Sequence, residues 1–169
     1  MLDQMSATAP RMLLTECNYP SSEGVTAFSE ASRSTTVTLR DNTGGSIDVH
    51  VTGEAPQWFV AMLEDIQKAL VLRANWDGYG AIAVTKEAAR SIIMLAANLM
   101  RPNTPRPSVV PTNRGGLQLE WHQGGVDLEI RSSMPGVYEA FYCDADGEWE
   151  RTLFFNFTEL TPKLAKLVH

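Results

Sequence analysis

Cysteine and long apolar runs are both scarce in this chain of 169 residues. Its two cysteines, Cys17 and Cys143, lie in very different settings, whereas disulfide-stabilised secreted domains carry several in a regular framework. No segment approaches the roughly 20 apolar residues that cross a bilayer. The N-terminus also lacks the apolar run of about 7–15 residues that marks a signal peptide. These absences predict a cytoplasmic protein with no disulfide framework and no membrane-spanning segment.

Basic residues are also few, at 14 Lys and Arg against 20 Asp and Glu, which gives a formal net charge of -6. Proteins that bind nucleic acid directly rely on clustered Lys and Arg, and here the basic residues are scattered. Direct nucleic-acid binding is therefore not expected. Between positions 139 and 150 the chain instead has five acidic residues and no basic one. Such a segment is either a solvated rim that aids solubility or a surface that attracts a basic partner.

The length and composition predict one globular domain with a distinct N-terminal segment. Residues 1–34 are rich in Ser, Thr, Ala and Pro without a sustained period, so we interpret them as flexible or draped over the domain. Residues 35–169 form the predicted single domain. It opens with alternating polar and apolar residues at 36–40 and 46–51, which predict a β-hairpin around an Asp-Asn-Thr-Gly-Gly turn.

After the hairpin, the apolar residues of the sequence have the spacing of α-helices. Apolar residues recur at three- and four-residue steps after Pro56 as far as Arg73, and a second helix begins after the potential cap Thr85 and ends before Pro102. Turn residues then separate five strands, at 109–110, 117–122, 126–131, 137–143 and 148–155, and a short helix follows Thr161. The chain is therefore predicted to be α+β, an antiparallel β-meander packed against a helix pair, with an N-terminal β-hairpin and a short C-terminal helix.

The segment 75–81 between the two predicted helices is the first with functional potential. Its two glycines permit a tight turn, Asp77 can accept bonds from the turn backbone, and Trp76 and Tyr79 can anchor the loop in the core. The loop is either a rigid corner or a binding site that includes Asp77 and Tyr79. It is no phosphate-binding loop, because no strand precedes it and a third glycine is missing.

The predicted hairpin 117–131 is the second segment with functional potential. If both of its apolar rows face one core, Trp121 should pair with Val126 and Leu119 with Leu128. That register places Glu120 opposite Asp127, and like charges across a ladder are unfavourable. We expect compensation from an arginine such as Arg131 or Arg114, from a bound cation, or from a basic partner chain.

Three interpretations of this hairpin stay open: a solvated face, a partner-binding surface or a metal site. A divalent metal could use the ligand types of Glu120, His122, Asp127 and Glu129, although Arg131 is a poor substitute for the lysine that nucleases use. We assign no catalytic residue and no cofactor. The candidate partner-binding residues are Gln118, Glu120, His122, Asp127, Glu129, Arg131, Asp77 and Tyr79.

Residues 70–132 carry a recognisable pattern: a W-D-G-Y-G-A loop, a capped helix, Pro111 and then G-G-L-Q-L-E-W. Together they resemble a family of small, uncharacterised bacterial proteins with a WDGYGA-type loop followed by a GGLxLEW strand. The resemblance implies a bacterial accessory protein of mobile or defence-type regions, and it brings no catalytic residues with it.

We therefore expect a non-enzymatic bacterial protein-interaction module, similar to an antitoxin, an immunity protein or a regulator. It would bind a protein partner, of basic character, through an acidic sheet face. One alternative is a metal-dependent hydrolase or nuclease that uses the carboxylates of the hairpin. Another is a structural homo-oligomer joined through the last strand or the aromatic C-terminal segment.

Overall fold

The computed structural model describes residues 11–15 and 34–168, and there it confirms the predicted α+β fold. The N-terminal sheet has the order β1-β3-β2, and the second sheet has the order β4-β5-β6-β7-β8. All neighbouring strands in both sheets are antiparallel. The elements are β1 (Arg11–Thr15), β2 (Ser34–Arg40), β3 (Ser46–Thr52), α1 (Gln57–Leu70), α2 (Lys86–Leu99), β4 (Ser108–Pro111), β5 (Leu117–Gln123), β6 (Val126–Met134), β7 (Val137–Asp144), β8 (Gly147–Phe154) and α3 (Thr161–Lys166).

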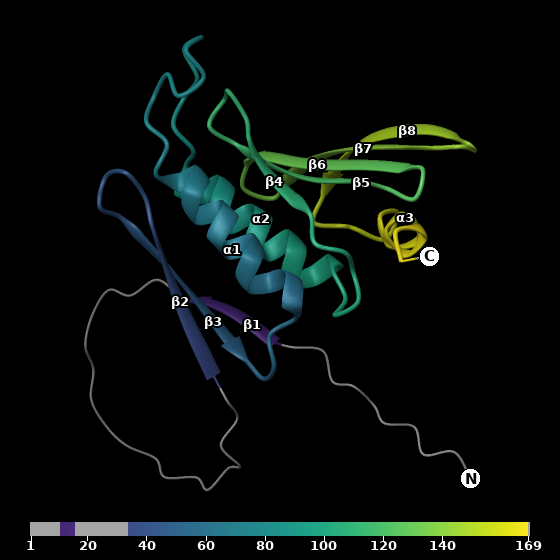
Figure 1. The fold of residues 1–169 in the computed structure, drawn as a ribbon, viewed down its shortest axis with the longest axis horizontal. Coiled ribbons are helices and arrows are strands. Elements are labelled where there is room, and N and C mark those ends of the chain that lie inside the picture. The colour runs from purple at the N-terminus through teal and green to yellow at the C-terminus, as the bar shows by residue number, and fades with distance from the viewer. Residues whose placement is uncertain (1–10, 16–33, 169) are drawn as a thin grey trace, which may run out of the picture.

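The helix pair lies between the two sheets (Figure 1). Helix α1 contacts β2 and β4, and α2 contacts β3, β5 and β6, so each helix touches both sheets. The short α3 lies against the other end of the five-stranded sheet, on the same side as the helix pair (Figure 1). One face of the five-stranded sheet is therefore covered by helices, and its opposite face is the outer face. No helix in the described part of the chain is long and apolar enough to cross a membrane.

The ends of the helices follow the local sequence. The Thr85 hydroxyl accepts a hydrogen bond from the Ala88 amide at 3.1 Å, as expected of an N-cap, and α2 ends at Leu99, ahead of Pro102. Helix α1 ends at Leu70 instead of continuing to Arg73. Asn75 has a φ of 62°, in the left-handed region, so the chain has already turned into the loop by that residue.

Strand β1 was not anticipated from the sequence. It pairs with β3 along the edge opposite β2, from Arg11 facing Thr52 to Thr15 facing Asp48. This strand falls within residues 1–34, which we had interpreted as flexible or draped. The remaining parts of that segment, 1–10 and 16–33, lie outside the described residues. The short sequence R-M-L-L-T has no alternation that would indicate a strand.

The core fills both spaces between the helix pair and the sheets. Burying an aliphatic or aromatic side chain there contributes about 1.5–3 kcal/mol. Two buried tryptophans also fix the connector between α2 and β4: the Trp58 indole donates to the Arg101 carbonyl at 2.9 Å, and the Trp121 indole donates to the Pro105 carbonyl at 2.8 Å. The largest fully buried side chains are Tyr138, Phe59, Met62, Leu63, Ile66, Leu70, Ile92, Ile93, Leu95, Leu117, Leu119 and Leu128.

Candidate functional site

The hairpin of β5 and β6 turns at Gly124 and Gly125, whose φ angles are 63° and 75°. Two left-handed residues suit the tight turn that best matches strand twist. Trp121 consequently pairs with Leu128 and Leu119 with Ile130, so the register predicted from the sequence was wrong by two residues. The prediction left residues 122–125 unpaired, whereas the two glycines alone make the turn. A shift of two residues preserves sidedness, and the apolar rows still share one core.

The corrected register changes which charged residues are neighbours. Glu120 faces Glu129 instead of Asp127, His122 faces Asp127, and Gln118 faces Arg131. The ladder continues onto β7 and β8, where Phe141 faces both Glu129 and Glu150. We call the outer side of the five-stranded sheet the acidic face, because six carboxylates share it. They are Glu120, Asp127, Glu129, Glu139, Glu148 and Glu150.

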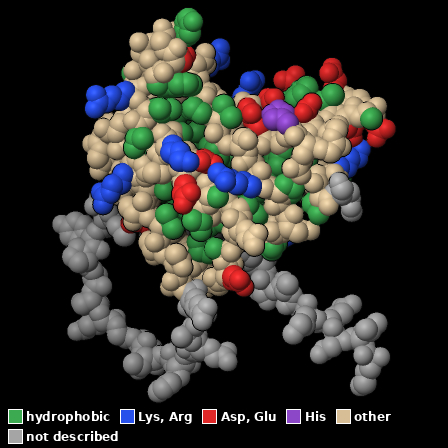
Figure 2. Space-filling view, in the orientation of Figure 1, with side chains coloured by type: hydrophobic (Ala, Val, Ile, Leu, Met, Phe, Trp, Pro, Cys, Tyr) green, Lys and Arg blue, Asp and Glu red, His purple; other side chains and the backbone are tan. Residues whose placement is uncertain are grey.

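Acidic side chains gather over this sheet in the space-filling view, with a histidine among them (Figure 2). Glu120 and Glu129 are half-buried, whereas Glu148 and Glu150 near the edge are exposed. The central carboxylates therefore have fixed neighbours, and the outer ones are open to a partner.

The repulsion between Glu120 and Glu129 is relieved within the molecule. The side-chain amide of Gln118 donates to Glu120 at 2.9 Å and to Glu129 at 2.7 Å, so one NH₂ group bridges the two carboxylates. The sequence led us to expect compensation from an arginine such as Arg131 or Arg114, from a bound cation, or from a basic partner chain. Arg131 instead bonds with its Nε to Glu139 on β7. Gln118 thus acts as a positioning group for the two carboxylates.

His122 lies between two other carboxylate oxygens. Its Nδ1 is 2.9 Å from Asp127 Oδ1, and its Nε2 is 3.3 Å from Glu120 Oε2. The hydrogen bonds to Asp127 and Glu120 raise the pKa of His122 above its ordinary 6.5. The two carboxylates therefore stabilise the protonated ring of His122 relative to the neutral ring.

The contacts of His122 limit its use as a ligand in the metal interpretation. The four proposed ligands Glu120, His122, Asp127 and Glu129 do lie on adjacent strands. However, both nitrogens of His122 face carboxylates, and a histidine must present a free lone pair to bind a metal. Among the residues that the structure describes, no group of three or more His, Cys, Asp or Glu is placed to hold a metal ion.

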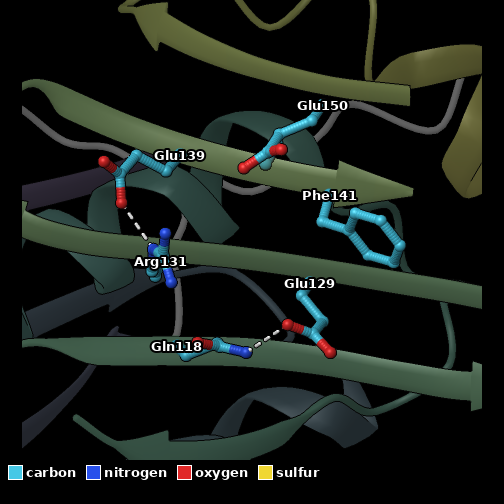
Figure 3. A pocket seen from close by; sticks show the side chains of 7 residues that line it. Gln118, Glu129, Arg131, Glu139, Phe141 and Glu150 are labelled. Atoms are coloured by element: carbon cyan, nitrogen blue, oxygen red, sulfur yellow. Dashed lines mark hydrogen bonds and ion pairs between the residues drawn. The ribbon is translucent and has the colours of Figure 1, made fainter. Parts of the chain in front are cut away.

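A cavity of about 190 Å³ opens on the acidic face around Phe141. Figure 3 shows Glu129 and Glu150 on either side of Phe141, and the Arg131–Glu139 ion pair at the other end. Phe141, Glu139 and Glu150 are not among the site residues predicted from the sequence. On β7, Glu139 and Phe141 alternate with the buried Tyr138, Ala140 and Tyr142, which places them on the outer face. On β8, Glu150 is placed there by its alternation with Trp149 and the buried Leu153.

Asp77 and Tyr79 belong to the loop between α1 and α2. Asp77 accepts hydrogen bonds from the amides of Tyr79 at 2.8 Å and Ala81 at 3.1 Å, and these bonds lower the pKa of Asp77. Tyr79 is 94% exposed, so the expectation that it anchors the loop in the core was wrong. Asp77 holds the shape of the loop, while the Tyr79 ring projects into solvent.

The same loop contacts the turn before β5. Ile82 donates its amide to the Asn113 carbonyl at 2.9 Å, and Thr85 donates to the Gly115 carbonyl at 3.0 Å. Ile82 and Arg114 also form a parallel bridge. Residues 82–85, which directly follow the WDGYGA motif, therefore pack against the turn that precedes β5, although the two segments are distant in the sequence.

The pKa of His122 gives a direct test of its two carboxylate contacts. In an NMR titration, the His122 ring should titrate with a midpoint above 6.5, and Asp127→Asn should lower that midpoint. Because the pKa is raised in the folded state, its stabilising contribution is present below pH 6.5 and is lost as the pH rises through the raised pKa. The effect on stability should be small, since the side chain is 51% exposed. A midpoint at or below 6.5 would contradict the described contacts.

Comparison of the chain with protein-family models, curated proteins and solved structures found no match. The resemblance of residues 70–132 to the small bacterial family with a WDGYGA-type loop therefore stays a prediction.

Proposed function

We propose that this chain is a non-enzymatic, cytoplasmic bacterial interaction module of the antitoxin, immunity or regulator type. It binds a basic protein partner through the acidic face. The observation that carries this proposal is the collection of six carboxylates on one side of one sheet. On β5 to β8, the cationic or potentially cationic side chains of this face are Arg131 and His122, and both are already engaged with carboxylates on it. Arg114, in the turn before β5, lines a cavity with Arg131 and Glu139 at one end of the face.

The opposed like charges of this face lower the stability of the sheet, which favours a role for them other than stabilising the fold. Opposed like charges in a ladder destabilise a sheet by some tenths of a kcal/mol per pair, and lysine or arginine at position 120 or 129 would remove that penalty. The chain instead holds Glu120 and Glu129 in place with an uncharged amide. A field of one sign steers an oppositely charged protein toward the surface and raises its association rate.

The cavity around Phe141 supports a lysine or arginine as the group that is recognised. A cation above an aromatic ring is stabilised by the ring face, and carboxylates on both sides add charge-assisted hydrogen bonds. The protein already holds a cation in this manner on its helix-covered side, where Lys163 Nζ lies 4.0 Å from the Tyr142 ring centroid and 4.6 Å from that of Trp149. Phe141 with Glu129 and Glu150 offers the same chemistry to an external side chain.

The alternative function, a metal-dependent hydrolase or nuclease, would need the carboxylates of the hairpin free to bind a metal. The contacts of His122 and Gln118 favour protein binding over metal binding, because they already engage both oxygens of Glu120 and one oxygen each of Asp127 and Glu129.

Capture from a native bacterial extract tests the proposal. The immobilised wild-type chain should retain a basic protein that elutes as salt rises, because exposed charge pairs are screened within about 10 Å at 0.1 M ionic strength. The double variant Glu120→Lys/Asp127→Lys should retain much less of it. Equal retention of the same protein by both chains, or retention that is insensitive to salt, would exclude the acidic face as its binding site.

A further inference from the structure

The two edges of the five-stranded sheet are protected very differently. The β4 edge is only four residues long, ends at Pro111, and follows Pro105 and Pro107 in the chain. Short strands and prolines are common means by which proteins prevent further strand pairing. The β8 edge has eight residues and no proline. Only β8 therefore offers a long, regular row of backbone groups at the side of the sheet.

The ladder shows which backbone groups of β8 are available. The β7–β8 hairpin turns at Ala145 and Asp146, with Asp144 facing Gly147. In such a hairpin the residues next to the turn and every second residue after them bond across the ladder, and the intervening residues direct N–H and C=O outward. Those outward residues are Glu148, Glu150, Thr152 and Phe154. The Glu150 carbonyl accepts a bond from Arg151 Nη1 at 2.8 Å, and an added strand would replace that donor with its own amide. Among the described residues, no strand pairs with this edge.

The outward residues also carry the charges of the acidic face. Glu148 and Glu150 project from the outer side of β8, directly beside the free edge. A strand added to this edge would place its own side chains opposite them, and opposite charges in that position stabilise the pairing. The edge therefore favours an extended segment with lysine or arginine at alternate positions.

A second copy of the same chain fits this edge poorly. Antiparallel pairing of two β8 strands centred on Glu148 or Glu150 puts a glutamate opposite its own copy. Centring on Trp149 opposes Glu148 to Glu150, and centring on Arg151 opposes two arginines. Each of these four registers opposes like charges and is therefore destabilised. A register centred on Thr152 opposes no like charges, but it places Glu150 opposite Phe154 and gives the carboxylates of β8 no cationic partner. The charge pattern of β8 thus favours a basic partner over self-association through this strand.

We infer that the partner's basic segment joins the sheet as an antiparallel sixth strand beside β8, with its alternate cationic side chains on the acidic face. This inference rests on the proposed function and adds the mode of binding to it. Main-chain hydrogen bonds supply affinity in this mode, and the alternating side chains supply specificity. The residue opposite Glu150 on the added strand is two strand spacings, about 10 Å, from Phe141, and a lysine or arginine side chain can extend over Glu150 toward that ring.

The test uses a short capped peptide of alternating lysine and valine, with binding measured by calorimetry on the full chain. Thr152→Pro removes an outward N–H without touching the bonds to β7, and Thr152→Ala is its matched control. We expect the proline variant to bind more than about tenfold more weakly and the alanine variant to bind as the wild type does. A peptide of the same composition with its lysines in one block should also bind more than about tenfold more weakly.

A second measurement leaves the protein unchanged. N-methylation of the lysine amides, which would face β8, should abolish binding, whereas N-methylation of the valine amides should not. Failure of the alternating peptide to bind, or equal binding of the two methylated peptides, would overturn strand addition. If Thr152→Pro binds normally while Glu129→Lys/Glu150→Lys binds weakly, edge pairing fails and the acidic face stands. If neither variant weakens binding, both proposals fail.

Discussion

The double variant Glu129→Lys/Glu150→Lys is expected to bind the captured partner on the order of 100-fold more weakly than the wild type, equivalent to about 3 kcal/mol. Both carboxylates border Phe141, so the reversal replaces attraction by repulsion on two sides of the recognised cation. The fold should tolerate it, because a lysine at position 129 would face Glu120 and remove the like-charge pair. Titration calorimetry with the purified partner measures the loss.

The matched control is Glu54→Lys/Glu64→Lys. Both residues are exposed, Glu64 on α1 and Glu54 just before it, and neither belongs to the five-stranded sheet. Each reversal adds two units of charge, so both double variants change the formal net charge from -6 to -2. The control should bind within about threefold of the wild type, because distant charges are screened. Equal losses in the two variants would mean that overall charge, and not the acidic face, determines binding.

Gly115→Ala should lower the free energy of unfolding by about 3 kcal/mol, against about 1 kcal/mol for Gly125→Ala. Both glycines have left-handed backbones, with φ of 78° and 75°, so both substitutions incur the same conformational strain. They differ in their surroundings. A Cβ at Gly115 would lie 2.9 Å from the Ala83 carbonyl oxygen and 3.2 Å from Ile82 Cγ2, whereas one at Gly125 meets nothing within 4 Å.

The extra loss at Gly115 measures the contact between residues 82–83, directly after the WDGYGA motif, and the turn before β5. Chemical unfolding of the two variants beside the wild type gives the comparison, and Gly125→Ala serves as the control for strain alone. The described packing would be wrong if the two substitutions destabilised the chain equally. That outcome would mean that the loop and the β5 turn separate freely in solution.

Much of the fold could be predicted from the sequence because its signals are local. The helical spacing around Phe59 to Leu70, the Thr85 cap and the turn glycines of the meander each depend on neighbouring residues. Strand β1 could not be predicted, because its five residues become a strand only by pairing with β3, more than thirty residues further along the chain. The helix-covered and outer sides of the meander strands were predictable from alternation alone.

The site was harder to predict, because it depends on which residues face each other. The choice of turn at Gly124-Gly125 decides whether Glu120 meets Asp127 or Glu129, and a sequence pattern allows both. Glu148, Glu150 and Phe141 belong to the site only because β7 and β8 follow β6 in the sheet, and the sequence does not give that strand order directly. The role of Gln118 also could not be predicted, because its amide bonds Glu120 on its own strand and Glu129 on the neighbouring strand, which requires the register to be known.

The central claim is that the outer face of the five-stranded sheet is covered when the partner is bound, and Cys143 can report on it directly. This half-buried free thiol faces Asp127 and Glu148 on the acidic face. With Cys17 replaced by serine, the alkylation rate of Cys143 is measured with and without saturating partner. The account predicts that the rate falls by about tenfold or more in the complex, as expected for a thiol excluded from solvent. An unchanged rate in the saturated complex would contradict it and move the binding surface elsewhere on the molecule.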